Sequence, residues 1–495
     1  MRWQHPIIYG LLSIAAGAIF VLGLAPWQLW PAIPVSAGLL LWLLHRPFCT
    51  SGFMTGWLYG LGFFGAGASW VYVSINVYGH ASPPLAALLT LIFCAGLAVL
   101  FGLQSWLYKR FLAHINFAPS LAFPALWVLF EGLRSWLLTG FPWLYSGYGA
   151  IDTPMAGWAP ISGVFGLSMA LVLLGSLPVT ALILPAHRRQ VLTSWLVLLL
   201  ILLMGGNVLR HHNWTRHQGA PLQVAIYQPN IPLEKKWDRR EFRQILQQFR
   251  TATDPLYAEN NLIIWPESAL PAFRHHIEPF LDDISQRAKS SNSTLITGIP
   301  SRDENGFHNS ILALGNGDGI YHKQKLVPFG EYVPLENWLR GLIDFFDLPM
   351  SNFVAGPPKQ TMLRAGKLQV ATFICYEVVY PDFVARGTKD ANFLVTISND
   401  SWFGRSIGPL QHLQMARFRA IETDRDMLRG TNDGVSAIID HKGVLRVQGA
   451  QFVETTVLGS IQPRTGSTPF METGSWPVWS LCMIFLAICL RQARR

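Results

Sequence analysis

The first 208 residues of this chain carry very few charges, and this scarcity limits what they can fold into. They contain seven Lys or Arg and two Asp or Glu, whereas the other 287 residues contain 31 and 27. About a quarter of the residues in a typical soluble domain are charged, so residues 1–208 are not expected to form a surface that faces water. The chain therefore combines a membrane part with a soluble part, which excludes a purely cytosolic enzyme, a disordered protein and a fibrous protein.

Eight apolar stretches predict a multi-pass helical membrane domain. Seven of them precede the polar region, and the eighth lies near the C-terminus. Most approach the roughly 20 residues that a helix needs to cross a bilayer, and the second is the shortest. We place them at about residues 7–25, 31–45, 53–75, 85–108, 119–138, 161–186, 191–208 and 474–490.

Positive charges alternate between the loops of this membrane part. Lys and Arg occur at the N-terminus, in alternate loops and at the C-terminus, whereas the loops near 26–30, 76–84 and 140–160 contain none. Because cytoplasmic loops carry the excess of Lys and Arg, we expect both termini inside the cell and the polar region outside.

The distribution of charge bears on the expected partners and on the domain bounds. Part of the net charge of +9 comes from these loops, and no long basic run accompanies it, so nucleic acid is not an expected partner. The predicted division is a membrane domain with helices 1–7 at residues 1–208, an exported domain at 209–470, and an eighth helix with a cytoplasmic C-terminus at 471–495.

One pair of charges falls inside a predicted membrane helix. Glu131 and Arg134 are three residues apart, which places them on one side of a helix. A charge pair within the membrane suggests a functional site. Two interpretations stay open, mutual neutralisation within the fold and binding of a lipid headgroup.

The exported region alternates between short apolar segments and helix-like segments, which predicts an α/β layered domain with its strands covered on both faces. The expected strands are residues 222–229, 262–267, 294–300, 369–375 and 392–398, and the clearest helices are 239–252 and 277–290. Active groups in such a domain lie at strand ends, where Glu267 and Cys375 both fall.

Cys375 is the only one of the five cysteines in the exported region. A cysteine on an apolar strand usually packs in the core. However, an unmatched cysteine in an exported domain can also be a reactive thiol. Because Cys375-Tyr376-Glu377 ends the apolar run, we expect the sulfur at a junction between strand and turn, which favours the reactive thiol.

Three chemically distinct side chains, Glu267, Lys323 and Cys375, follow one another at intervals of about fifty residues. They lie in Trp-Pro-Glu, in Tyr-x-Lys-x-x-Leu-Val-Pro-Phe-Gly-Glu and in Cys-Tyr-Glu. With these motifs the exported region resembles the nitrilase (carbon–nitrogen hydrolase) superfamily. Together with the eight membrane stretches, nearly the whole chain resembles its membrane-integrated branch, the apolipoprotein N-acyltransferase family of bacterial envelopes.

This resemblance implies an αββα sandwich for the exported domain, with Glu267, Lys323 and Cys375 as a catalytic triad. It also implies a bacterial inner-membrane protein whose catalytic domain lies in the periplasm. The chain would transfer a fatty acyl group from a phospholipid to the α-amine of the S-diacylglyceryl-cysteine of an apolipoprotein. It would work as a monomer among membrane lipids. The accessory or substrate-binding residues implied are Trp237, Asn309, Glu331, Tyr376, Glu377 and Trp402.

The triad residue types suit such a transfer. Glu267 would act as the base that takes the thiol proton. Lys323 and the backbone N–H after Cys375 would stabilise the tetrahedral oxyanion. A thioester keeps the transfer potential of the ester, so two balanced half-reactions would follow with ping-pong kinetics.

No cofactor or metal is expected. The sequence lacks a Gly-x-x-x-x-Gly-Lys-Ser/Thr phosphate loop, and it lacks Cys-x-x-Cys. Its two adjacent histidine pairs, at 211–212 and 275–276, do not have the spacing of metal ligands on a helix.

An apolar segment at residues 335–353 contains Trp338 and Phe346 among few charges. Two interpretations are open, a covering loop that faces the bilayer and a buried core segment.

Two other functions compete with acyl transfer. A membrane-anchored amidase or nitrilase would pass the acyl group to water, but seven spans exceed what an anchor needs. A transport or structural membrane protein with an inactive hydrolase-like domain would not need an intact triad.

Overall fold

The computed structural model describes residues 4–49, 51–328, 330–332 and 352–493 of the chain. These residues form two compact units. Unit 1 comprises Met1–His212, Ser406–Gln414 and Thr473–Arg495, and unit 2 comprises Asn213–Arg405 and Met415–Glu472. The segment Ser406–Gln414 is thus grouped with unit 1, although it lies far along the chain from the other parts of that unit.

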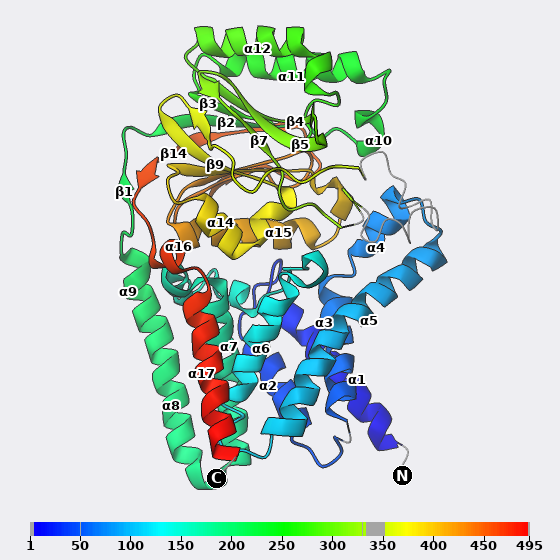
Figure 1. Cartoon of the computed structure of the whole chain (residues 1–495), viewed down its shortest axis with the longest axis vertical. Helices are drawn as coiled ribbons and strands as arrows, with labels where there is room; N and C mark the ends of the chain where they lie inside the picture. The colour runs from blue at the N-terminus through cyan, green and yellow to red at the C-terminus, as the bar shows by residue number, and fades with distance from the viewer. Residues whose placement is uncertain (1–3, 50, 329, 333–351, 494–495) are drawn as a thin grey trace. The chain divides into compact units, whose positions relative to one another are not determined.

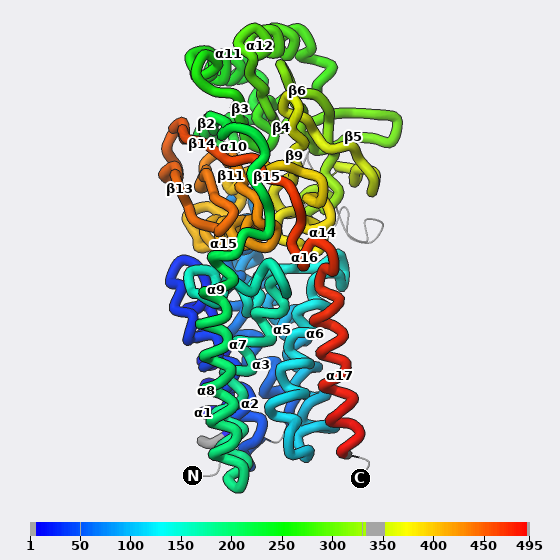
Figure 2. Tube along the Cα trace, turned by 90° about the vertical axis from the view of Figure 1, so that its left-hand side faces the viewer, coloured from blue at the N-terminus to red at the C-terminus, as the bar shows by residue number. Residues whose placement is uncertain are grey.

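Unit 1 is built of helices that run side by side (Figures 1 and 2). Every apolar stretch expected from the sequence contains one of them. They are α1 (Gln4–Val21), α2 (Ala32–Leu44), α3 (Gly52–Gly67), α4 (Val71–Val73), α5 (Pro83–Leu107), α6 (Ala122–Arg134), α7 (Ala159–Ile183), α8 (Arg188–Leu200), α9 (Gly206–His211) and α17 (Trp476–Ala493).

Not every one of these helices is long enough to cross a bilayer by itself. Among the described residues, three continuous helical segments have the necessary length and apolar composition, namely Pro83–Leu112, Pro154–Ile183 and Pro185–His211. A fourth is counted if Gly52–Gly67 and Val71–Tyr78, which meet at a 64° bend, form one span. The number of eight crossings therefore stays a prediction.

Glycines let the helices of unit 1 approach closely. A Cβ atom on Gly62 of α3 would overlap the carbonyl oxygen of Ile14 on α1, and one on Gly56 would overlap the carbonyl oxygen of Phe101 on α5. Small residues at such positions allow backbones to pack without a side chain between them. α3 is thus held between two neighbouring helices.

The described residues of unit 2 form two large sheets. The first has the order β14 (Thr455–Ile461), β2 (Leu222–Gln228), β3 (Leu262–Ile264), β4 (Thr294–Asp303), β5 (Gly306–Gly315) and β7 (Ile320–His322). The second has the order β13 (Leu445–Gln448), β12 (Ala437–Ile439), β11 (Met427–Thr431), β10 (Phe393–Ser398), β9 (Leu368–Ile374), β8 (Leu363–Ala365) and β6 (Gly317–Asp318). A separate short pair joins β1 (Arg216–His217) to β15 (Arg464–Thr465).

These sheets are the two middle layers of a four-layer sandwich (Figure 1). Helices α11 (Phe242–Thr253) and α12 (Glu278–Ser290) cover the first sheet, and α14 (Pro381–Gly387) and α15 (Gly408–Thr423) cover the second. Two further short helices among the described residues are α10 (Leu233–Lys236) and α16 (Pro469–Thr473). The expected αββα arrangement is therefore present in this part of the chain.

The alternation of side chains along β2 explains the layering. Val224 and Ile226 belong to the core between the sheets, whereas Ala225 and Tyr227 belong to the core beneath α11 and α12. Successive side chains of a strand point to opposite faces, so an entirely apolar strand is buried on both. The sequence predicts this burial on both faces, but one of the two covers is a second sheet rather than a helix.

Candidate functional site

Parallel strands bring the candidate side chains to one end of the sandwich. β2, β3 and β4 are parallel to one another, as are β9, β10 and β11. Glu267 follows β3, Lys323 follows β7, and Cys375 follows β9. The triad predicted from the sequence thus combines two residues from the first sheet with one from the second.

Lys323 is the centre of a buried charge cluster. Its side chain is only 1% exposed, and its Nζ lies 2.8 Å from both carboxylate oxygens of Glu331 and 3.4 Å from Oε1 of Glu267. Burial by itself would lower the pKa of Lys323, but the carboxylates of Glu331 and Glu267 outweigh burial and raise this pKa above its ordinary value. The ammonium therefore remains charged at any physiological pH.

Asn309 on β5 holds the two carboxylates in place. Its Nδ2 donates to Oε1 of Glu267 at 2.7 Å and to Oε1 of Glu331 at 2.9 Å. The backbone N–H of Lys323 in turn donates to the Asn309 carbonyl at 2.8 Å. Within the described ranges, Oδ1 of Asn309 is buried without a hydrogen-bond partner. Asn309 and Glu331, both accessory residues predicted from the sequence, are thus directly bound to the triad.

The second oxygen of Glu267 faces the other sheet. Oε2 accepts a hydrogen bond of 2.8 Å from the backbone N–H of Asn399, which directly follows β10. With Lys323 and Asn309 at Oε1 and Asn399 at Oε2, both oxygens of the carboxylate have partners. This arrangement fixes the orientation of the proposed base.

Cys375 begins a short 3-10 turn, Cys375–Val379, at the end of β9. Its φ is +50°, a conformation that non-glycine residues seldom adopt. Strained backbone of this kind persists only where surrounding contacts hold it, and it is common at functional sites. The sulfur is therefore at the strand–turn junction expected from the sequence.

Glu377 supplies those contacts. Its fully buried carboxylate accepts hydrogen bonds from Ile374 N–H at 2.8 Å, from the Tyr321 hydroxyl at 2.8 Å, and from Gln324 N–H at 2.6 Å. Burial raises the pKa of Glu377 to about 7, although the backbone N–H groups act in the opposite direction. One carboxylate thus ties the cysteine turn to the segment after Lys323.

The electrostatics at the thiol favour its neutral form. Burial raises the pKa of Cys375, and the nearby carboxylates of Glu267 and Asp400 raise it further, whereas Lys323 and a hydrogen bond with Ser398 lower it. A standing thiolate is therefore disfavoured. This suits a reaction in which a base removes the thiol proton during attack.

The remaining predicted accessory residues lie in turns beside this cluster. Tyr376 is buried in the cysteine turn, and its ring meets the ring of Tyr380 edge-on at 5.4 Å. Trp402 lies in the 3-10 turn Asp400–Phe403, just after Asn399. Trp237 is 39% exposed and follows α10 directly.

Two residues of the cluster were not nominated from the sequence. Asn399 lies in the Ser-Asn-Asp-Ser-Trp-Phe-Gly segment, but only its backbone contacts Glu267, so its side-chain type carries no signal. Lys236 donates from Nζ to the backbone carbonyl of Glu267 at 3.0 Å. Lys236 directly follows Lys235, and the sequence alone does not show which of the two lysines is buried.

The side chains of Glu131 and Arg134 in unit 1 have hydrogen-bond partners outside the pair. No ion pair joins the two side chains in the described part of the chain, although both are buried on α6. Oε1 of Glu131 accepts from the backbone N–H and the hydroxyl of Ser146 at 2.8 and 2.7 Å, and a guanidinium nitrogen of Arg134 donates to the Trp143 carbonyl at 2.9 Å. The charge of Glu131 nevertheless acts electrostatically on Arg134, and both side chains also brace the segment that contains Trp143 and Ser146.

The segment 335–353, predicted to be either a covering loop that faces the bilayer or a buried core segment, lies outside the described residues except for its final two. The described residues contain no group of three His, Cys, Asp or Glu side chains suited to a metal ion.

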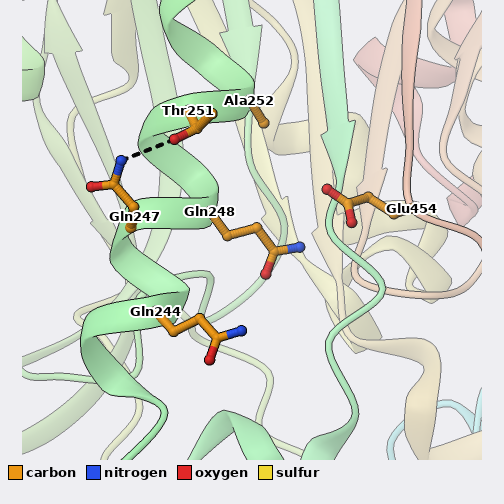
Figure 3. A pocket seen from close by; sticks show the side chains of 6 residues that line it. All are labelled: Gln244, Gln247, Gln248, Thr251, Ala252 and Glu454. Atoms are coloured by element: carbon orange, nitrogen blue, oxygen red, sulfur yellow. Dashed lines mark hydrogen bonds between the residues drawn. The ribbon is translucent and has the colours of Figure 1, made fainter.

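A surface hollow of about 460 Å³ lies elsewhere on unit 2 (Figure 3). It is lined by Gln244, Gln247, Gln248, Thr251 and Ala252 of α11 and by Glu454. Its lining contains neither a thiol nor an ammonium group, so the glutamate–lysine–cysteine cluster lies elsewhere.

Comparisons with known proteins show which families and relatives this chain is similar to. A family profile described as "Apolipoprotein N-acyltransferase N-terminal domain" matches residues 16–177, and one described as "Carbon-nitrogen hydrolase" matches residues 223–470. The apolipoprotein N-acyltransferase of Pseudomonas syringae pv. tomato is 45% identical over 100% of this chain and 99% of its own length. That of Pseudomonas aeruginosa is 46% identical over 100% and 98%. A CN-hydrolase superfamily protein from Xanthomonas campestris, whose structure is solved, is 17% identical, with a TM-score of 0.39 over 53% of this chain and 97% of its own.

Proposed function

Because this chain belongs to the apolipoprotein N-acyltransferase family, we propose that it transfers a fatty acyl chain from a phospholipid to the α-amine of an S-diacylglyceryl-cysteine at the N-terminus of an apolipoprotein. The observation that carries this proposal is the buried cluster in which one lysine contacts the carboxylates of Glu267 and Glu331 beside the turn that contains Cys375. Such a cluster holds a base, a fixed positive charge and a nucleophile together.

In the first half-reaction, Glu267 takes the thiol proton while the sulfur of Cys375 attacks the ester carbonyl carbon of the phospholipid. The carbonyl oxygen becomes an oxyanion, which Lys323 and the backbone N–H after Cys375 stabilise. When the intermediate collapses, the C–O ester bond breaks and Glu267 returns the proton to the departing oxygen. A lysophospholipid leaves, and the acyl group remains on sulfur as a thioester.

In the second half-reaction, the α-amine of the acceptor attacks the thioester carbonyl. Glu267 now accepts a proton from the amine, the C–S bond breaks, and the sulfur recovers a proton. The products are an amide on the acceptor and the thiol of Cys375. Lys323 stabilises the oxyanion of both half-reactions. Because the thioester keeps the transfer potential of the ester, no nucleotide is consumed, and the covalent intermediate leads us to expect ping-pong kinetics.

The accessory residues have supporting parts in this proposal. Asn309 and Glu331 hold the base and the lysine, and Glu377 holds the cysteine turn. Tyr376, Trp237 and Trp402 border the cluster and are assigned to substrate binding.

The proposal also includes a membrane topology. The charge pattern of the loops supports eight crossings of the bacterial inner membrane, with both termini in the cytoplasm. In this topology residues 1–208 form the membrane domain, residues 209–470 form a periplasmic catalytic domain, and residues 471–495 contain the last helix. We further propose that the chain acts as a monomer.

The test is to incubate the purified protein with a phospholipid that carries a labelled acyl chain, with and without a diacylated peptide. Intact mass should increase by one acyl group on the wild type and on the control Cys94→Ala, which alters a buried cysteine of α5, but not on Cys375→Ala. Labelled acyl-peptide should then form. Release of free fatty acid alone would support a hydrolase instead, and equal adducts on all three proteins would refute the proposal.

A further inference from the structure

Lys236 is a buried lysine that the proposed reaction does not use. It is the last residue of α10 and is 1% exposed, whereas its neighbour Lys235 on the same helix is exposed. Its Nζ donates to the backbone carbonyl of Glu267 at 3.0 Å. Burying an ammonium is costly unless it is paired, so the position of Lys236 calls for an explanation.

The turn that Lys236 contacts determines where the Glu267 side chain points. Ser268, the next residue, has a φ of +46°, which is unfavourable for a residue with a Cβ atom. Backbone hydrogen bonds from Gly298 to Pro266 at 3.2 Å and from Ala269 to Gly298 at 3.0 Å hold this turn on one side. The hydrogen bond from Lys236 holds it on the other side, at the peptide unit between Glu267 and Ser268.

Two carboxylates balance the charge of Lys236, namely Glu267 itself and Asp433. Burial lowers the pKa of Lys236 to about 8, and both carboxylates act against this decrease. Asp433 follows β11, and its Oδ2 lies 2.7 Å from the Ser401 hydroxyl, which is also 2.7 Å from Oδ1 of Asn399. Burial raises the pKa of Asp433 to about 6.

Resting on the proposed function, we propose that Lys236 is a positioning residue for the base. Its ammonium holds the strained backbone at Glu267 and supplies a second positive charge that acts on the Glu267 carboxylate. In this role it keeps the carboxylate aimed at the thiol of Cys375 while the proton moves. It touches neither substrate nor the reacting atoms.

This role differs from a merely structural one in what it predicts. Loss of a hydrogen bond from a charged group commonly lowers the reaction rate about 10- to 100-fold when that bond stabilises the proton-transfer step. The phospholipid KM should stay unchanged, because Lys236 does not contact lipid. Above about pH 8 the wild type should lose activity as Lys236 loses its proton.

The experiment compares Lys236→Met, Lys236→Arg and the matched control Lys235→Met in the full-length protein. The measurements are the single-turnover rate of acylation from labelled phospholipid, its KM, its pH profile and the thermal unfolding of each variant. We expect Lys236→Met to lower the rate about 10- to 100-fold with an unchanged KM. Lys236→Arg, which keeps a charge that does not titrate, should recover most of the rate and lack the decline above pH 8.

A Lys236→Met rate equal to that of Lys235→Met, or a loss matched by its unfolded fraction, would overturn the inference. If Lys236→Met does not fold, the wild type and Lys236→Arg are compared instead. Identical declines of their acylation rates above pH 8 would overturn the inference. Cys375→Ala separates the two proposals. If Cys375→Ala still forms the acyl adduct, the proposed function fails. If Cys375→Ala forms no adduct but the Lys236 variants acylate as fast as Lys235→Met, only the positioning role fails.

Discussion

Replacing Lys323 by Met should separate the stabilising and catalytic contributions of the buried charge cluster. Met has a similar length but no charge, so it leaves the carboxylates of Glu267 and Glu331 together without their cation. Removing one partner of a buried ion pair typically costs about 3–5 kcal/mol. For a domain of this size such a loss corresponds to a decrease of roughly 6–20 °C in Tm.

The pH dependence sharpens this prediction. The raised pKa of Lys323 means that the wild type keeps the ammonium at every pH between 5 and 8, so its contribution to stability is constant there. In Lys323→Met, the unpaired carboxylates can be relieved by taking up a proton as the pH falls. The difference in Tm between wild type and variant should therefore be smaller at pH 5 than at pH 8.

The assay is thermal unfolding of the detergent-purified protein at both pH values, together with acylation rates. The control is Lys325→Met, since Lys325 is exposed and its ammonium lies 5.4 Å from the Tyr380 ring rather than in the cluster. Acylation by Lys323→Met should fall about 100- to 1,000-fold, the usual cost of losing one oxyanion donor. A Tm equal to that of Lys325→Met, or a difference that widens at pH 5, would refute the reasoning.

The contacts of Glu377, Asn309 and Gly62 can each be tested by one substitution. The pKa of Glu377 is raised to about 7, so the folded protein keeps a proton that the unfolded chain has already lost, and wild-type stability should decrease as the pH rises from about 4.5 to 7. In thermal unfolding, Glu377→Gln should show a flatter dependence of Tm on pH, and parallel profiles would contradict this. Asn309→Ala removes the amide that joins Glu267 to its neighbour, so acylation should decrease about tenfold with KM preserved; an unchanged rate would exclude that role. Gly62→Ala should separate α1 from α3 and reduce Tm and yield, whereas Gly65→Ala, which meets nothing within 4 Å, should not; similar behaviour of the two would count against close packing.

Part of the candidate site could be predicted because Glu267 and Cys375 follow apolar segments. Glu267 comes shortly after the apolar strand β3 and Cys375 directly after the apolar strand β9, and the end of an apolar run is visible in the letters alone. The structure places both where that pattern predicts. The layered fold of the second unit was accessible for the same reason, since its strands are apolar on both faces.

Other contacts depend on the backbone and could not be read from residue types. Asn399 binds Glu267 through its N–H, which every residue except proline has. Lys236 and Lys235 are the same letter, and only the course of the chain after β2 buries one of them. The three-residue spacing of Glu131 and Arg134 placed them on one helix side, but the segment around Ser146 offered each a separate partner.

The division of the site between two sheets affects how the protein should lose its activity. Glu267 and Lys323 are carried by the first sheet, while Cys375 and Asn399 are carried by the second. A small slip of one sheet over the other would leave nearly all secondary structure intact but would draw the base away from the sulfur. On gentle heating, inactivation should therefore precede melting. For the same reason, a compound that wedges the two sheets apart could inhibit the enzyme without imitating either substrate.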